Sequence, residues 1–259
     1  MTNLPPPPPP GDGAVPPPPP PQLIAPGGYV GYSGGAVPLK RVGGLQRAAS
    51  LVITASVLVL VLELVVSATL DDDAQAFLDG RTSSEQFLED IAPYLLLTFA
   101  QGGLVIASIV LVLIWMRRLA VNHRALQRVG TWGPGWAIGG WFLPPLLYVI
   151  PTLMLRELWR ASDPDVPIGG DWRSRPASPL IDVWFVAYSL IPLVLTFVQT
   201  DTVLSGIGGS EQELADQLTG GQATVIASTL ASVVAAAVWI RMTQALTSRH
   251  RRLTGETPA

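Results

Sequence analysis

The chain has no cysteine, two histidines, one lysine and few charged residues, which make up 14% of its 259 positions. Without cysteine it forms neither a disulfide nor a zinc–thiolate site, and thiol catalysis is excluded. Both histidines, His123 and His250, lie in arginine-rich segments, which argues against a histidine-bound metal. A soluble protein of this length carries more surface charge, so the low charge and the positive mean hydropathy of +0.40 indicate a membrane protein.

Motifs of common enzyme classes are also missing. The sequence contains no phosphate-binding G-x-x-x-x-G-K-[ST] loop and no H-E-x-x-H zinc motif. Residues 206–209 form a glycine-rich loop in an acidic segment that would repel phosphate. Residues 71–73 are consecutive aspartates and lack the spaced oxygen ligands of a calcium loop. We therefore expect no enzymatic activity, no cofactor, no bound metal and no nucleic-acid partner.

Four apolar runs are long enough to cross a membrane as helices. A span needs about 20 apolar residues to cross roughly 30 Å of hydrocarbon. The runs lack the alternation of barrel strands, and an open sheet in lipid would leave backbone groups unpaired. The predicted spans are residues 48–70, 94–116, 180–200 and 223–240. The expected fold is an all-α integral membrane protein, with its membrane domain over residues 45–251 and a short C-terminal tail over 252–259.

Basic and acidic clusters alternate along the chain and predict its orientation. Basic residues precede the first span and follow the second and fourth, whereas acidic residues follow the first and third. Basic loops stay in the cytoplasm, so four spans place every basic cluster and both termini on the cytoplasmic side. Heavy use of Ala, Val, Gly, Pro and Arg is typical of a GC-rich bacterium such as an actinobacterium. We therefore expect the protein in a bacterial cytoplasmic membrane.

A fifth apolar stretch, residues 135–155, is interrupted by glycine and proline. Each proline removes a backbone donor and breaks or kinks a helix, so a straight span is not expected. If the stretch crossed the membrane, the last basic cluster would face outside. We therefore predict that it re-enters the inner leaflet or lies on it, where irregular backbone must be buried in protein or line a wet cavity. A short helix over residues 152–162 is expected to lead back to the cytosol.

This stretch and its flanks carry a resemblance to a known family. The shared residues are tryptophans, glycines, prolines and a few polar groups: Trp115, Arg118, Asn122, Pro134, Gly135, Trp136, Ala137, Gly139, Gly140, Trp141, Phe142, Pro144, Pro151, Arg156, Glu157 and residues 159–164. The pattern resembles that of the actinobacterial membrane family called domain of unknown function 4328, over about residues 45–251. The resemblance implies a four-span membrane domain and no particular activity.

Ten residues are candidates for a functional or structural role: Glu63, Arg118, Asn122, Gly139, Gly140, Trp141, Pro144, Arg156, Trp159 and Asp182. Glu63 lies within the first span, where a carboxylate is costly. It is either a proton relay or cation ligand, or a protonated group hydrogen-bonded to a neighbouring helix. The second interpretation is favoured because no other acid, histidine or lysine lies mid-span.

Three of the other polar candidates have competing interpretations. Asp182 either pairs with Arg156 or Arg160, or is an exposed interfacial acid. Arg118 and Asn122 share one helix face at i, i+4 spacing. They hold the backbone of the interrupted stretch, bind an anionic lipid headgroup, or simply belong to the cytoplasmic basic cluster.

The N-terminal tail, residues 1–38, contains two proline runs followed by a Gly/Tyr/Ser segment. Proline runs adopt polyproline II and the glycine-rich part is flexible, so we expect a disordered cytoplasmic tail. It is either a docking arm for a Pro-binding cytosolic protein or a spacer that binds nothing specific.

These features predict a non-enzymatic scaffold or interaction protein of the membrane, whose partners are membrane lipids and a cytosolic protein bound through the tail. Small residues at four-residue spacing in the last span, Ala227, Ala231 and Ala235, pack helices within the monomer or form a homo-oligomer. The alternative function is a small transporter, channel subunit or lipid-handling protein that uses Glu63 and residues 135–155.

Overall fold

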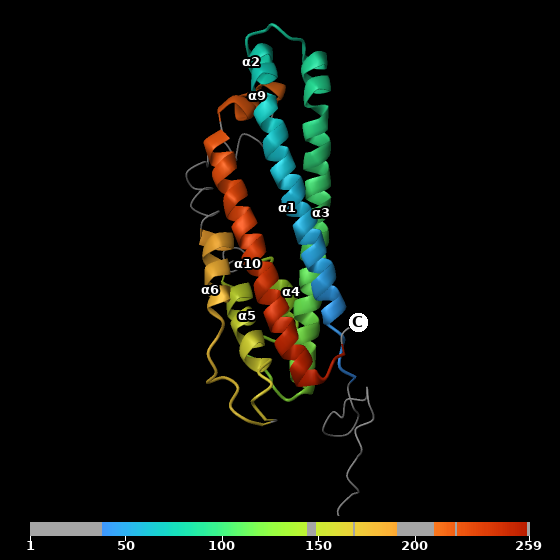
Figure 1. Ribbon diagram of the computed structural model, residues 1–259, viewed down its shortest axis with the longest axis vertical. Helices are drawn as coiled ribbons and strands as arrows, with labels where there is room; N and C mark the ends of the chain where they lie inside the picture. Colours follow the sequence, from blue (N-terminus) through green and yellow to red (C-terminus); the bar gives the residue numbers. More distant parts are fainter. Residues whose placement is uncertain (1–37, 144–148, 168, 191–209, 221, 258–259) are drawn as a thin grey trace, which may run out of the picture.

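The computed structural model describes residues 38–143, 149–167, 169–190, 210–220 and 222–257, and all regular structure in these ranges is helical. Its frame consists of three long helices: α1 (Gly43–Thr69), α3 (Ser84–Ala125) and α10 (Gln222–Thr254). Helix α1 packs against both of the others, and the three run along the long axis of the molecule (Figure 1).

Within the described residues, these three helices are long and apolar enough to cross a membrane. Large apolar side chains on them point outward, among them Leu51 and Phe99, which are 71% and 80% exposed. Such a surface fits lipid contact and would be unfavourable in water. The expected all-α membrane architecture is therefore present. The predicted span over residues 180–200 begins with α6 (Pro179–Phe185) and the π-helical turn η1 (Val186–Leu190), and its remainder lies outside the described residues.

Helix α3 is much longer than the apolar run inside it. It starts ten residues before the predicted span, where the hydroxyl of Ser83 accepts a hydrogen bond from the Gln86 backbone N–H at 3.3 Å. With 42 residues it measures about 63 Å, twice the hydrocarbon thickness. The hydrophobic run therefore marks the lipid-embedded part, and the helix projects beyond it at both ends.

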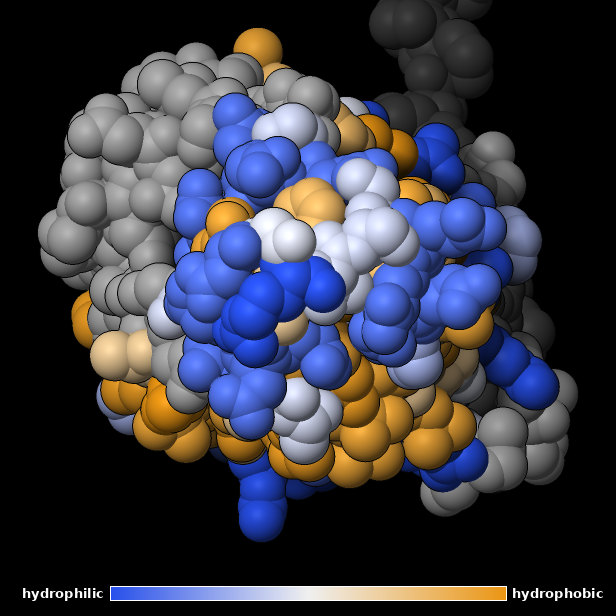
Figure 2. Space-filling model, turned by 90° about the horizontal axis from the view of Figure 1, so that it is seen from above, coloured by the Kyte–Doolittle hydropathy of each residue, from blue (hydrophilic) through white to orange (hydrophobic). Residues whose placement is uncertain are grey.

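One end of the bundle, the cap end, is formed by α2 (Asp71–Leu78), α9 (Glu211–Gly220) and the start of α3. Phe77 and Phe87 stack there with ring centroids 4.5 Å apart, and Ala215 and Leu218 of α9 belong to the same buried cluster. The three aspartates of residues 71–73 form the first turn of α2, where negative charge favours the helix dipole. Figure 2 looks down on this end and shows hydrophilic residues over it, with hydrophobic residues at its margin.

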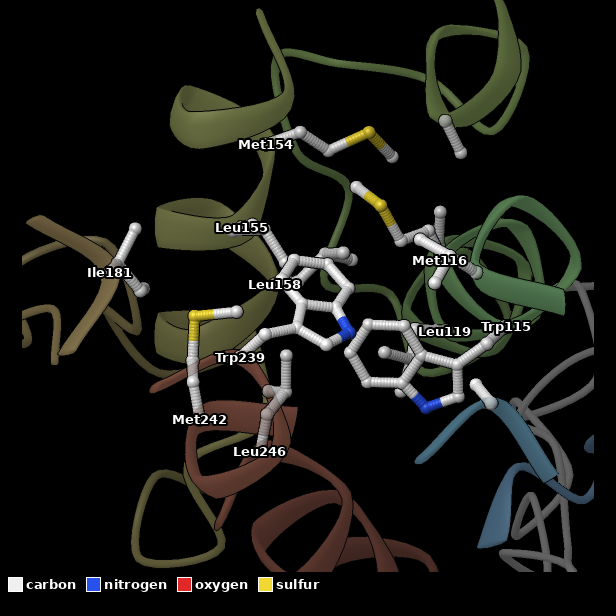
Figure 3. Packing of buried hydrophobic residues seen from close by; sticks show 14 of the residues in the cluster. Trp115, Met116, Leu119, Met154, Leu155, Leu158, Ile181, Trp239, Met242 and Leu246 are labelled. Atoms are coloured by element: carbon white, nitrogen blue, oxygen red, sulfur yellow. The ribbon is translucent and has the colours of Figure 1, made fainter. Parts of the chain in front are cut away.

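The opposite end, the basal end, is formed by the start of α1, the last turns of α3 and α10, and α5 (Ile150–Ala161). Its core is a buried cluster that includes Trp115, Met154, Ile181 and Trp239 (Figure 3). The rings of Trp115 and Trp239 meet edge to face at a centroid distance of 6.3 Å. Side chains from four helices therefore interlock at this end.

The interrupted stretch, residues 135–155, forms a short helix α4 (Trp136–Gly139), a turn, and the start of α5. The expected short helix is present, shifted by one to two residues. Pro151 lies in the first turn of α5, where its missing N–H and fixed φ are tolerated, so it starts the helix instead of kinking it. Pro144 and Pro145 lie outside the described residues.

Candidate functional site

The predicted pair Arg118 and Asn122 binds the backbone of residues 40–41, and within the described residues it makes no hydrogen bond to the interrupted stretch. Asn122 accepts a hydrogen bond from the Lys40 N–H through Oδ1 at 2.8 Å and donates one to the Lys40 carbonyl through Nδ2, also at 2.8 Å. Arg118 Nη1 donates to the Arg41 carbonyl at 2.9 Å. The i, i+4 pair therefore holds the chain immediately before α1.

Glu256 completes this arrangement from the other terminus. Its carboxylate accepts hydrogen bonds from the backbone N–H groups of Val42 and Gly43, at 3.2 and 3.1 Å. Both groups lie at the N-terminus of α1, where N–H groups lack intrahelical partners and a negative charge is favourable. We call Arg118, Asn122 and Glu256, acting on residues 40–43, the root clamp.

A buried polar chain continues from Asn122 into α10 and α5. Asn122 Nδ2 lies 3.0 Å from His250 Nε2, and the His123 ring meets that of His250 edge to face at 5.1 Å. His123 Nε2 lies 3.0 Å from the Ser162 hydroxyl. Because an amide NH₂ only donates, His250 Nε2 accepts, so its ring is neutral with the proton on Nδ1. Both histidines are thus structural links between helices.

Arg128 ties the end of α5 to the segment after α3. Its side chain is 2% exposed, and Nη1 donates to the carbonyls of Ala161 and Asp163 at 2.8 and 2.7 Å, while Nη2 donates to that of Val166. Carbonyls at a helix C-terminus lack intrahelical donors, and a cation there is favourable. Arg128 therefore has a structural role as the donor to three backbone carbonyls, in addition to belonging to a basic cluster.

The Asp163 carboxylate joins α5 to α10. It pairs with Arg249 Nη2 at 3.0 Å and lies 3.6 Å from Arg175 Nε. Arg249 also lies over the ring of the predicted candidate Trp159, 5.0 Å from its centroid. Trp159 is therefore placed as a cation–π partner in this junction.

Arg156 and Asp182 form the ion pair that was one of the two predicted alternatives. Arg156 Nη2 lies 2.5 Å from Asp182 Oδ1, with the two side chains 39% and 57% exposed. Next to it, Glu157 accepts hydrogen bonds from the N–H groups of Thr131 and Trp132 at 3.1 and 3.2 Å. A Cβ at Gly130 would lie 2.5 Å from the Glu157 carboxylate, so glycine at this position leaves room for the carboxylate to reach the two N–H groups.

The two neighbouring glycines of the interrupted stretch differ in their surroundings, because Gly140 is tightly packed and Gly139 is not. A Cβ at Gly140 would lie 2.4 Å from the Ile150 side chain, whereas one at Gly139 would meet nothing within 4 Å. Gly140 therefore lets the turn approach α5. The candidate that follows it, Trp141, contacts Trp184 and Tyr188 with ring centroids 6.3 Å away in each case. The candidate Pro144 lies outside the described residues.

Glu63 is separate from all of these groups. It lies on α1, where its carboxyl group interacts with Thr98 of α3, while its Oε1 has no hydrogen-bond partner among the described residues. Its place between two helices is the one expected for a carboxyl group bonded to a neighbouring helix. Glu63 shares no hydrogen bond or ion pair with the described parts of the interrupted stretch, residues 135–143 and 149–155.

Sequence reasoning missed Glu256, Arg128, His123, His250 and Asp163 as members of the basal network. Glu256 had one signal, because it is the lone acid in an otherwise basic C-terminal segment. For the two histidines and Arg128 the sequence offers no signal beyond the residue type, since their partners lie in other segments of the chain.

Fold and site together define an α-helical membrane protein whose basal end is fixed by a buried polar network. The family described as "Domain of unknown function (DUF4328)" matches residues 89–248. The chain belongs to this family, which confirms the resemblance noted in the sequence. The match begins in α3 and ends in α10, so it contains Arg118 and Asn122 but neither residues 40–43 nor Glu256. A search of the curated proteins and a search of the solved structures each found no match.

Proposed function

We propose that the protein is a non-enzymatic anchor of the bacterial cytoplasmic membrane that presents a proline-rich docking arm from a fixed point. The observation that carries this proposal is the root clamp. Asn122 is hydrogen-bonded to both the backbone N–H and the carbonyl of Lys40. The Glu256 carboxylate accepts hydrogen bonds from the backbone N–H groups of Val42 and Gly43. Residues 1–38 end directly at this clamp.

A fixed root favours a docking arm over a passive spacer. A spacer that binds nothing does not need an ordered attachment to the membrane domain. A partner bound to the tail, in contrast, is held at a defined position only if the tail leaves the membrane domain at a defined place. The effective concentration of a tethered ligand depends on where its linker begins and how far it reaches. Six prolines in a row stand at 5–10 and again at 16–21, outside the described residues, and proline runs favour the polyproline II conformation that Pro-binding grooves accept.

Four spans with both termini in the cytoplasm are part of the proposal. The basal end carries the basic clusters and the cap end carries the acidic ones, as the positive-inside rule requires for a cytoplasmic basal end. Residues 180–200 supply the fourth crossing, which begins at α6 beside α10. With four crossings, residues 135–155 enter from the cytoplasmic side and return there through α5.

The test is a mild-detergent pull-down from the native host with three forms of the full membrane domain. One carries the natural tail, one lacks residues 1–38, and one has both proline runs replaced by Gly/Ser of equal length. We expect a specific partner only with the natural tail, because Gly/Ser keeps the reach but loses polyproline II. An identical set of proteins from all three forms would refute the docking arm.

A further inference from the structure

A cavity of about 520 Å³ lies between α1, α3, α10 and the α6–η1 segment. This is the size range of small-molecule binding sites. It lies level with the apolar parts of the three candidate spans, so a ligand would reach it from the lipid phase. Glu63 is not part of its lining, and none of its lining residues carries a charge.

The side walls of the cavity are mainly aliphatic, with the polar side chains of Ser56, Gln101, Ser108 and Ser232 among them, and the side wall formed by α10 consists of small residues. Ile53 and Leu60 of α1 face it together with Ile109 of α3, whereas α10 contributes Ala235 and Ala236. The small residues on α10 create the space. A charged ligand would be costly here, while a hydrocarbon chain would find mostly apolar contact.

Aromatic rings line the basal end of the cavity. Trp184 stacks on Tyr188 at 4.9 Å and contacts Trp239 at 4.9 Å, with Trp141 beside them. Tyr188 lies in the π-helical turn η1, and such turns occur frequently at functional sites. The chain therefore departs from regular helix where it meets the cavity.

Trp141 lines the cavity and carries a buried indole N–H that lacks an acceptor among the described residues. Buried tryptophan N–H groups usually find an acceptor, and leaving one unpaired is unfavourable. The side-chain amide in the lining, that of Gln101, already donates to the Ser56 hydroxyl at 2.9 Å. A ligand that fits this cavity therefore brings an acceptor oxygen to Trp141.

We propose that the cavity binds one ester-linked acyl chain, with its carbonyl oxygen accepting a hydrogen bond from Trp141 Nε1 and its hydrocarbon running along α1, α3 and α10 toward the cap end. The chain belongs either to a diacyl glycerolipid of the bilayer or to a free monoacylglycerol. These share the chemistry that the site recognises, a neutral acyl ester. This inference does not depend on the docking arm.

The experiment uses the full chain in phosphatidylcholine vesicles that contain a lipid with a diazirine in the middle of its acyl chain. One set of vesicles carries the probe as phosphatidylcholine and the other as monoacylglycerol. After irradiation, labelled residues are mapped by mass spectrometry. We expect labels on cavity residues such as Val112 and Ala235. Labelling by both probes identifies a bilayer lipid, and labelling by monoacylglycerol alone identifies the free species.

Two substitutions and one control substitution test whether the label reaches Val112 through the cavity and whether Trp141 binds the ligand. Ala236→Trp fills the cavity and should abolish labelling of Val112. The control Ala237→Trp places the same side chain one residue on, at an exposed position outside the lining, and should preserve the label. Trp141→Phe keeps an aromatic ring but removes the N–H, and should lower the labelling yield at limiting probe about fivefold, the loss of one ordinary hydrogen bond.

Labels confined to outward-facing residues such as Phe99 and Leu230 would overturn the proposal, as would unchanged labelling of Val112 in Ala236→Trp. The map on the unaltered chain decides the question even if a variant does not fold. A yield unaffected by Trp141→Phe would overturn the assignment of the carbonyl.

Discussion

The two ends of the bundle are built differently although α1 and α3 run through both. At the cap end, α2 and α9 are held by a small apolar cluster around Phe77 and Phe87. At the basal end, buried polar side chains bind backbone groups of other segments, as Asn122 does with Lys40 and Arg128 with Ala161.

The cap end is closed by side-chain packing, whereas the basal end joins segments that are distant in the sequence. An apolar cluster closes the cap end without fixing any chain terminus. Directional hydrogen bonds at the basal end fix where the N-terminal tail starts and where α5 ends. We expect substitutions at the two ends to act independently, because distant sites without shared partners are additive.

The largest effect is expected at Arg128. Arg128→Met leaves three carbonyls of Ala161, Asp163 and Val166 without their donor, and should lower the free energy of unfolding by about 4 kcal/mol. The measurement is denaturation by SDS in mixed micelles. Arg124→Met, at an exposed position on the last turns of α3, is the matched control and should change it little. Equal effects of the two would show that Arg128 acts only through its charge.

The cap end should respond to Phe87→Ala. Phe87 is fully buried against Phe77, and truncating such a ring creates a cavity that costs about 3 kcal/mol. Hydrogen exchange should rise in α2 and α9 and stay unchanged in residues 40–43. Faster exchange at residues 40–43 as well would contradict the independence of the two ends.

Asn122→Ala should cost about 2 kcal/mol, because it removes two hydrogen bonds to Lys40 and leaves the buried His250 Nε2 without its donor. SDS denaturation measures the loss. Gln244→Ala, an amide truncated at an exposed position on α10, is the control and should be neutral. A neutral Asn122→Ala would show that the root of the tail is not held by this side chain.

The smallest effect belongs to the pair Arg156–Asp182. Both side chains are more than a third exposed, so solvent screens their attraction. A double-mutant cycle with Arg156→Gln and Asp182→Asn should give a coupling of about 0.5 kcal/mol. A coupling of several kcal/mol would mean that the pair is buried in the membrane-embedded protein.

Much of the fold was predictable because lipid imposes a simple rule on sequence. Apolar runs predicted the cores of α1 and α3, while the ends of α3 lay far outside the run because hydropathy reports the lipid-embedded part alone. The start of α3 had a local signal, Ser83 followed three residues later by Gln86.

The basal network was not predictable because its partners are distant in sequence. Glu256 binds residues more than two hundred positions away, and no periodicity marks such a contact. Arg118 and Asn122 were recognised as a pair sharing one face, but only the arrangement of helices reveals that this face meets residues 40–41. The pairing of Arg156 with Asp182 was one of two alternatives that the sequence left open.

The most direct test of the account is amide hydrogen exchange at residues 40–43 in the full chain in vesicles, compared with the double variant Asn122→Ala, Glu256→Ala. The root clamp predicts protected N–H groups at Lys40, Val42 and Gly43 in the unaltered chain. That protection should be lost in the variant, while exchange in α2 and α9 stays the same. Equally fast exchange at these three N–H groups in both proteins would contradict the clamp, and with it the fixed root on which the docking arm depends.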